Sequence, residues 1–317
     1  MTSSSVKSDF VIMPLVLFVL HKPHSSCMPF AGKENEYSRI SPKIEINFKD
    51  IVSRNIQTRM EIRHYFINQG VYLLSSGPTG DIHKTTQINH QLSRVHLDFE
   101  KNHKIHPHKL AFDLQFDKSV LKASLEYNYT YFYAKKSTFE YRFFGGQIFN
   151  NNYNIVPNYQ FRADGLSTSY AGSNDYLFDH TLVGRSESSG LWSHQMYIHE
   201  GGFKTSTPLG VSNWIISLNA SVAIPKAPII RIFASIATYD KAKRQLSNEG
   251  SFIYEAGFQL RFIKDIFEIY VPVFISQDLR MVNELNNRKY SDRIRFVLNL
   301  EALNPFKYKT YYHQLLM

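Results

Sequence analysis

Cysteine is nearly absent from this sequence, which has one, Cys27, among its 317 residues. A single cysteine excludes an internal disulfide and any zinc site built from several cysteines. Cys27 follows a short apolar stretch, as a lipoprotein acceptor cysteine does. However, the preceding His24-Ser25-Ser26 lacks the leucine and small residues of such a signal. We therefore interpret Cys27 as an unmodified leader residue.

Long apolar runs are also missing, since none approaches the roughly 20 residues that a membrane-spanning helix needs. The best candidate covers residues 10–20, follows Lys7 and is interrupted by Pro14. It has the length of a signal-peptide core, but Pro29 and Ala31 match a cleavage site poorly. A signal peptide and an unstructured leader both remain open for residues 1–40.

Recognisable nucleic-acid motifs are absent as well, although the formal net charge is +9. Binding to phosphates would need clustered Lys and Arg. The basic residues here are spread singly along the chain, without a helix-turn-helix or zinc-finger pattern. We predict no nucleic-acid partner, and we expect the positive charge to line a lumen or to meet anionic lipid head groups.

What the sequence does contain is a repeated alternation of apolar and polar residues, with 15% aromatics overall. Successive residues of a strand point to opposite faces, so each such stretch has one apolar and one polar side. This pattern is typical of an antiparallel transmembrane β-barrel. The clearest apolar sets are Leu110, Phe112, Leu114 and Phe116, and near the end Ile294, Phe296, Leu298 and Leu300.

The alternation predicts an all-β fold with about 12 strands, in a range of 10–16, within a barrel domain at 41–306 and followed by a tail at 307–317. Spanning strands must close on themselves, because an open edge in hydrocarbon leaves backbone groups unpaired. A soluble β-sandwich or lipid-binding barrel is the alternative fold. The expected strands lie near 43–49, 56–67, 95–99, 109–117, 121–133, 139–149, 192–198, 214–224, 230–236, 254–262, 267–275 and Phe296.

Aromatic residues gather toward strand ends, as in an interfacial girdle. Tyr127, Tyr129, Tyr131 and Tyr133 share one face of a predicted strand. Amphipathic rings settle at the level of lipid head groups. This grouping favours the membrane barrel over a soluble sheet.

The alternation stops between residues 150 and 189, where Asn, Gly, Ser, Asp and Tyr are frequent. This long inserted segment either folds into the lumen as a plug or hides a strand pair around 159–163 and 177–183. If both chain ends are periplasmic, 225–228 and 264–265 are inner turns, and 240–250 and 277–291 are outer loops. The inserted segment then falls on the periplasmic side.

Charged residues of the inserted segment are the candidate site. Charges in a narrow lumen need partners, so we hypothesise that four of them hold the segment against lumen residues, namely Asp175, Asp179, Arg185 and Glu187. The string at 184–190 lacks the Gly-x-Ser-x-Gly spacing of a hydrolase. We interpret His103, His106 and His108 as polar turn residues. The prediction contains no catalytic residue, metal or cofactor.

Several strings resemble the C-terminal outer-membrane β-barrel-like module of Bacteroidetes M1-family (gluzincin) metallopeptidases. They are FGGQIF from Phe144, DYLFDHTLVGRSESSG from Asp175, HEGGFK from His199, FIYEAGFQLRFIKDIFEIYVPVF from Phe252 and YSDRIRFVLNL from Tyr290. The catalytic chemistry of that family requires His-Glu-x-x-His. Here His199-Glu200 is followed by Gly201, Gly202 and Phe203, so the second histidine is missing.

The resemblance and the alternation together predict a non-catalytic barrel in the outer membrane of a Gram-negative bacterium, and the resemblance implies a member of the Bacteroidetes. Its expected role is a membrane anchor, assembly or gating module. The expected partners are the lipid bilayer and a peptidase-like periplasmic or surface protein. The alternative is a fragment of a zinc-dependent M1-type aminopeptidase whose catalytic domain lies elsewhere.

Overall fold

The computed structural model describes residues 15–21, 37–49, 56–77, 80–103, 106–135, 137–149, 159–167, 175–183, 187, 189–207, 210–240, 251–285, 287–300 and 302. The strands are β1 (Leu15–His21), β2 (Tyr37–Lys49), β3 (Ile56–Gly77), β4 (Gly80–Lys101), β5 (His108–Phe116), β6 (Leu121–Ala134), β7 (Ser137–Phe149), β8 (Phe161–Arg162), β9 (Leu166–Ser167), β10 (Gln195–Tyr197), β11 (Gly210–Val211), β12 (Trp214–Ile224), β13 (Ala227–Tyr239), β14 (Phe252–Ile263), β15 (Phe267–Ile275) and β16 (Arg295–Leu298). The helices are η1 (Leu191–His194), α1 (Gln277–Leu285) and η2 (Tyr290–Arg293).

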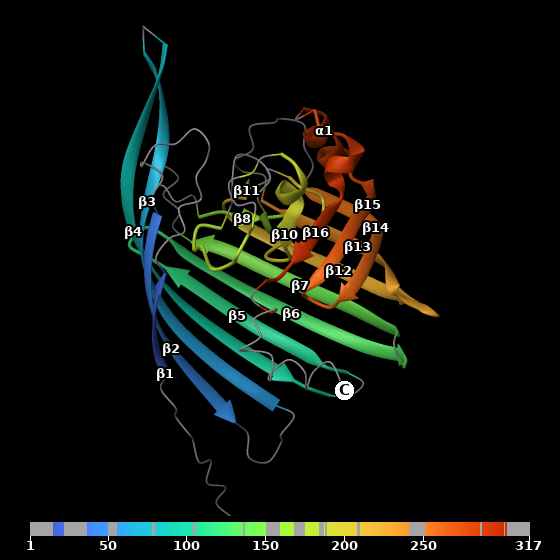
Figure 1. The fold of residues 1–317 in the computed structure, drawn as a ribbon. Coiled ribbons are helices and arrows are strands. Elements are labelled where there is room, and N and C mark those ends of the chain that lie inside the picture. The colour runs from blue at the N-terminus through green and yellow to red at the C-terminus, as the bar shows by residue number, and fades with distance from the viewer. Residues whose placement is uncertain are drawn as a thin grey trace, which may run out of the picture.

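One large curved sheet dominates the fold (Figure 1). Its fourteen strands follow the order β1-β2-β3-β4-β5-β6-β7-β12-β13-β14-β15-β16-β10-β9, and β8 and β11 form a separate pair. Every pairing in the large sheet is antiparallel except that of β10 with β16. The predicted all-β, antiparallel architecture is therefore confirmed.

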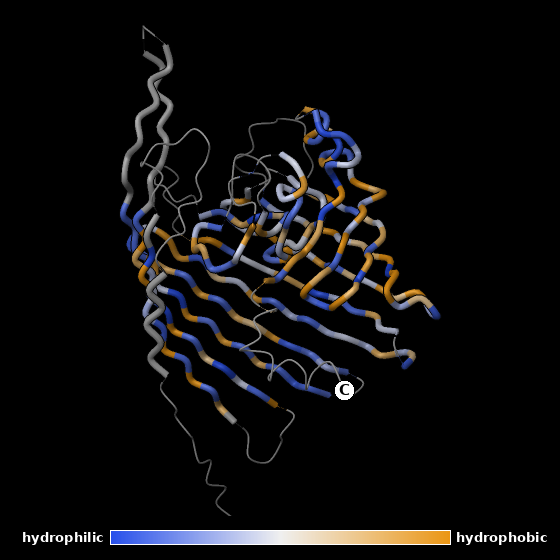
Figure 2. Tube along the Cα trace, in the orientation of Figure 1, coloured by the Kyte–Doolittle hydropathy of each residue, from blue (hydrophilic) through white to orange (hydrophobic). Residues whose placement is uncertain are grey.

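Apolar and polar residues alternate along the central strands of this sheet (Figure 2). Their side chains therefore point to opposite faces of it. On β12, Ser217 and Asn219 are buried, whereas Leu218 between them is 40% exposed. We call the face that packs against the described parts of residues 159–211 the inner face and the opposite one the outer face. The outer face carries a belt of apolar side chains that are 37–47% exposed, including Ile44, Ile62, Phe66, Leu97, Leu110, Phe112, Leu125, Phe139, Leu218, Ile232, Phe258 and Val273.

The inner face is polar and buried over most of its extent. Soluble proteins usually show the reverse, with apolar residues inside and charges outside. The buried polar side chains on these strands include Glu61, Asp98, Gln115, Lys122, Arg142, Ser217, Asn219, Arg231, Ser235, Glu255, Gln259, Glu268 and Arg295. This arrangement contradicts a lipid-binding barrel, which would enclose the apolar faces.

The two end strands of the large sheet are β1 and β9, and no pairing in the described ranges joins them. Closure of the barrel therefore stays a prediction. A sandwich would need two large sheets packed face to face. The described strands form a single large sheet, so the sandwich alternative is wrong.

The predicted strand at 192–198 is confirmed only for Gln195–Tyr197, and this changes the topology. Its first half is the 3-10 helix η1, and β10 has only three residues. Strand β7 pairs directly with β12, with Gln147 opposite Trp214. Because one spanning strand fewer precedes β12, the inserted segment leaves from the end of the sheet that also carries connections 240–251 and 276–294. Its predicted location at the inner-turn end is wrong.

The strand pair suggested inside the inserted segment is not formed either. Phe161–Arg162 pairs with Gly210–Val211 instead, and residues 177–183 contain no strand. An apolar cluster lies between the inserted segment and the inner face at this same end of the sheet. Its members include Tyr65, Ile67, Leu92, Phe144, Ile148, Phe161, Phe203, Ile215, Ala237, Ile253, Ile275 and Leu279. The inserted segment is thus packed on the sheet by a true hydrophobic core.

Candidate functional site

The candidate site is the contact between the inserted segment and the inner face. Because β7 pairs directly with β12, the inserted segment is from here on the whole stretch between them, residues 150–213. Two parts of it carry the site, which we call the limb (residues 175–183) and the strap (residues 199–207). The limb faces β2, β3 and β4, and the strap faces β7, β12 and β14. Beside the apolar cluster, each makes ion pairs or hydrogen bonds with these strands.

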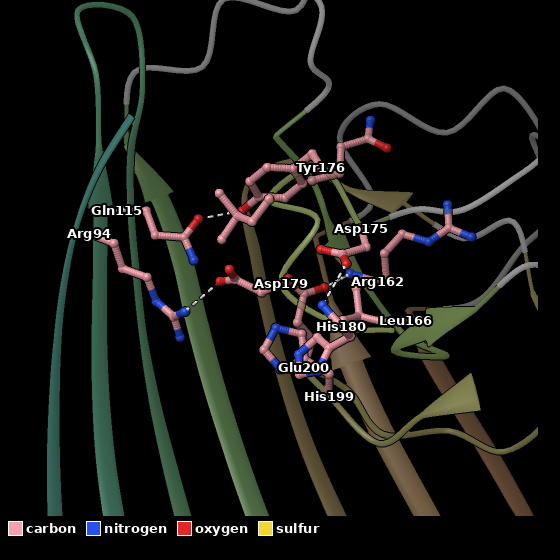
Figure 3. Close-up of a pocket in the computed structure, with 12 residues that line it drawn as sticks. Arg94, Gln115, Arg162, Leu166, Asp175, Tyr176, Asp179, His180, His199 and Glu200 are labelled. Carbon is pink, nitrogen blue, oxygen red and sulfur yellow. Dashed lines mark hydrogen bonds and ion pairs between the residues drawn. The ribbon is translucent and has the colours of Figure 1, made fainter. Parts of the chain in front are cut away.

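One carboxylate, that of Asp179, joins the limb to three strands. Its oxygens accept hydrogen bonds from Arg39 Nη1 at 2.7 Å, Arg63 Nη1 at 3.0 Å and Arg94 Nη1 at 3.2 Å. The Tyr65 hydroxyl donates a fourth at 2.7 Å. Figure 3 shows Asp179 directed at Arg94 on the strand. Burial alone would raise the pKa of Asp179, but Arg94 and Arg63 outweigh it and hold the pKa below the ordinary value.

The limb backbone reinforces this contact. Arg39 Nη1 also donates to the carbonyl oxygens of Leu177 at 2.7 Å and Phe178 at 2.9 Å. Phe178 has a φ of 54°, an uncommon value for a residue with a side chain. The turn is stabilised locally because the Asp175 carboxylate accepts the His180 amide at 3.1 Å. Arg39 therefore binds both the backbone carbonyls of this turn and the carboxylate of Asp179.

A buried lysine on β6 joins the limb and the strap. Lys122 Nζ lies 2.6 Å from Glu200 Oε1, and both side chains are nearly inaccessible, at 4% and 6% exposure. It also donates to the Gln160 carbonyl and to the Tyr176 hydroxyl, each at 3.2 Å. Since an unpaired buried charge is costly, Lys122 and Glu200 depend on each other.

The strap is bound to the opposite wall by backbone groups. Glu255 on β14 accepts the amides of Lys204 at 2.6 Å and Thr205 at 2.8 Å. Arg142 on β7 donates to the Glu200 carbonyl at 2.6 Å. These side chains provide hydrogen-bond partners for these backbone groups of the strap, which do not pair with the backbone of a neighbouring strand.

Close approach requires glycine within the strap. Gly202 has a φ of 68°, and a Cβ there would lie 2.8 Å from Arg142 Nη1. Any side chain at this position would be strained and would push against the guanidinium that binds the strap. The two glycines after His199-Glu200 thus serve packing in this structure.

Two titratable side chains of the strap have shifted pKa values. Burial lowers the pKa of His199 to about 4. Burial likewise lowers the pKa of Lys204 to about 8. Both shifts arise because the charged form loses its hydration inside the molecule. At neutral pH His199 is therefore an uncharged imidazole.

A small cavity of about 40 Å³ lies between limb and strap (Figure 3). A space of this size accommodates water and is far below the ~300 Å³ of typical ligand pockets. The residues around it include Arg94, Gln115, Arg162, Asp175, Tyr176, Asp179, His180, His199 and Glu200. The cavity is therefore a water-sized space bordered by the limb and the strap.

The four residues proposed from sequence have different positions. Asp179 reaches the arginines of the wall, and Asp175 is buried within the limb. Glu187 is exposed, and Arg185 lies outside the described residues. Their joint role stays a prediction. The sequence did not single out Lys122, Arg142 and Glu255. Each occupies a polar position in an alternating strand, and that position was the only sign that its side chain faces the interior.

Among the described residues, no group of three or more His, Cys, Asp or Glu side chains is arranged to hold a metal ion. No helix in the described ranges is long and apolar enough to cross a bilayer.

Comparison with known proteins shows no family for this sequence. Neither a protein-family model nor a curated protein matches this sequence. A solved structure that does match is CdiB from Acinetobacter baumannii, with a TM-score of 0.41 and 12% identity. The alignment covers 76% of this chain and 39% of the CdiB chain. This chain therefore spans well under half of the length of CdiB. Membership of the M1-related module stays a prediction.

Proposed function

We propose that this protein is a non-catalytic β-barrel of the outer membrane whose interior is occupied by the inserted segment. The observation that carries this proposal is the polarity of the sheet. Its outer face presents apolar side chains on most strands, while its inner face buries charged groups. A bilayer favours this arrangement, because hydrocarbon surrounds the outside and polar groups inside find partners.

The apolar belt is continuous across neighbouring strands. Ile232 on β13 lies opposite Phe258 on β14 in the pairing register, and each is 47% exposed. Contiguous apolar surface of this extent is rare on soluble monomers and marks contact with a membrane or a protein. Lipid tails cover such a belt without requiring specific partner residues.

The filled interior supports an anchor or assembly role over an open channel. The limb is bound to β2, β3 and β4 through Asp179. The strap is bound to β14 through Glu255. A segment held on two walls by buried bonds occupies the space that a solute would use. Release of the limb alone would provide gating, because its ionic contacts gather on one carboxylate.

The partner of such an anchor is proposed from sequence resemblance. Strings shared with the barrel module of M1-family metallopeptidases support a peptidase-like periplasmic or surface protein as the partner. The same strings support a second candidate, a fragment of a zinc-dependent aminopeptidase. The coding region upstream separates the two candidates, because His-Glu-x-x-His in the same reading frame would favour the fragment.

Heat-modifiable mobility tests the membrane barrel. Closed barrels keep their structure in cold detergent and unfold when boiled, so unboiled protein from the outer-membrane fraction should migrate differently from boiled protein. Identical mobility, together with recovery in the soluble fraction, would contradict the proposal.

A further inference from the structure

The two ends of the sheet differ in their connections. One end has short turns, which join β4 to β5, β6 to β7, β12 to β13 and β14 to β15. The other end has the inserted segment, the 240–251 connection and the α1–η2 region. We call the first end the short-turn rim, defined by residues 101–109, 133–139, 224–227 and 263–267 among those described.

Each described turn of the short-turn rim carries or adjoins a lysine. Lys135 and Lys226 are exposed at the turn tips, and Lys101 ends β4. No ion pair joins these three to another described residue. Lys264 differs, because its ammonium lies 3.7 Å from Glu140 inside the sheet. Three lysines of the rim are therefore available to an outside anion.

Among the described residues, the opposite end has no such excess of positive charge. Its exposed or half-buried charged side chains mix both signs along the same connections. They are Asp117, Lys118, Glu187, Asp240, Asp278, Arg280, Glu284, Arg288, Lys289, Asp292 and Arg293. The lysines of the short-turn rim are brought together by the fold, because its turns gather residues that are far apart in the sequence.

A belt of aromatic rings adjoins the lysines on the outer face. The Tyr129 hydroxyl and His106 Nδ1 share a hydrogen bond of 2.7 Å. The His106 ring stacks with Tyr131 at 5.3 Å between centroids, and Tyr129 contacts Tyr141 at 5.2 Å. Tyr131 and Tyr133 remain 41% and 37% exposed. Such rings settle between hydrocarbon and water, so this end lies at the level of lipid head groups.

We propose that the short-turn rim binds anionic phospholipid head groups, with Lys101, Lys135 and Lys226 contacting phosphate beside the tyrosine-histidine belt. The inference rests on the proposed membrane barrel and adds a lipid preference to one of its two ends. The positive charge of the three lysines supports anionic lipid as the binding partner. Lysine stems lie along apolar surface while the ammonium reaches outward, and lysines near a membrane surface attract anionic lipids.

Spin-labelled lipids measure this preference directly. The full chain is reconstituted in phosphatidylcholine vesicles with a trace of spin-labelled phosphatidylglycerol or phosphatidylcholine. We expect the wild-type protein to associate with phosphatidylglycerol about fivefold more strongly, the effect of roughly one lysine contact, and less strongly at high salt. Combining Lys101→Gln, Lys135→Gln and Lys226→Gln should bring the ratio close to one.

The matched control removes the same charge from the other end through Lys118→Gln, Arg280→Gln and Lys289→Gln, and should keep the wild-type ratio. Heat-modifiable mobility of each variant verifies that it is folded. Equal association of both lipids with inserted wild-type protein would overturn this inference alone, as would loss of preference in the control only. Failure of the wild-type protein to insert in either kind of vesicle would overturn the proposed barrel as well.

Discussion

At the scale of single residues, buried charges on the inner face are matched to partners from distant parts of the chain. Arg39 and Asp179 are 140 positions apart, and Lys122 and Glu200 are 78 apart. Removing one member of a buried pair leaves the other charge uncompensated, which costs far more than the pair contributes. Individual substitutions should therefore act strongly and locally.

Asp179→Asn should loosen the limb. The amide cannot balance Arg39, Arg63 and Arg94, so we expect a loss of about 3 kcal/mol or more in the stability of the limb contact. Limited proteolysis in intact membranes should then cleave near 175–183 faster than in wild type. Glu284→Gln removes an exposed carboxylate outside the inserted segment and should leave cleavage unchanged. Equal cleavage of Asp179→Asn and wild type would refute the role of this carboxylate.

His199 should make the strap sensitive to acid. Its folded pKa of about 4 lies below the unfolded value of about 6.5, so the unfolded state binds more protons between these values. Stability is thus complete above pH 6.5 and falls as the pH drops toward 4, by up to about 3 kcal/mol. Hydrogen exchange of residues 199–207 should accelerate over this window. His199→Gln should flatten that response, whereas the exposed His103→Gln should retain it.

The sequence predicted Asp179 as a plug contact but could not identify its partners. Alternation assigns Arg63 and Arg94 to the polar side of their strands, and it says nothing about which residue of a distant loop meets them. The same limit hid Lys122 and Glu255. Glu255 accepts backbone amides of the strap, and Lys122 pairs with the Glu200 carboxylate and the Gln160 carbonyl. Alternation identifies none of these partners.

At the scale of elements, the strap shows how irregular backbone is held against a regular sheet. It replaces strand pairing by bonds from Glu255, Arg142 and Asn219. Its glycine at position 202 combines a positive φ with a contact to Arg142. The strap should therefore tolerate little change at this point.

Gly202→Ala should lower stability by about 1–3 kcal/mol from backbone strain, and more because the new methyl group displaces Arg142. Gly190→Ala is a matched control, since Gly190 has a φ of 82° but nothing within 4 Å of a Cβ. The difference between the two variants in thermal loss of the heat-modifiable form measures the contact itself. A Gly202→Ala variant no less stable than Gly190→Ala would contradict the close packing.

Strand positions were predicted well where one face is apolar and the other polar. The predicted limits at 214–224 and 267–275 agree with β12 and β15. The error at 192–198 has a physical cause. Trp192, Met196 and Ile198 alternate in sequence, but Met196 packs with Phe233 and Tyr270 in an interior cluster. Alternation alone cannot distinguish a wall strand from a short strand inside.

At the scale of the whole molecule, the inverted polarity of the sheet organises the other features. A charged interior requires partners, which the inserted segment supplies, and an apolar exterior requires a nonaqueous surrounding. The overall antiparallel sheet followed from the sequence pattern. The filling of its interior did not, because residues 150–189 lack periodicity.

The proposed membrane barrel is tested most directly by measuring whether the outer face is surrounded by hydrocarbon or by water. In a Cys27→Ser background, nitroxide labels at Ala234→Cys and Phe258→Cys report from the middle of β13 and β14, and Lys135→Cys reports from a turn. In reconstituted vesicles the account predicts that the first two labels collide mainly with oxygen, which dissolves in hydrocarbon. The turn label should collide mainly with a water-soluble nickel chelate. Dominant nickel collisions at Ala234→Cys and Phe258→Cys would place the apolar belt in water and contradict the account.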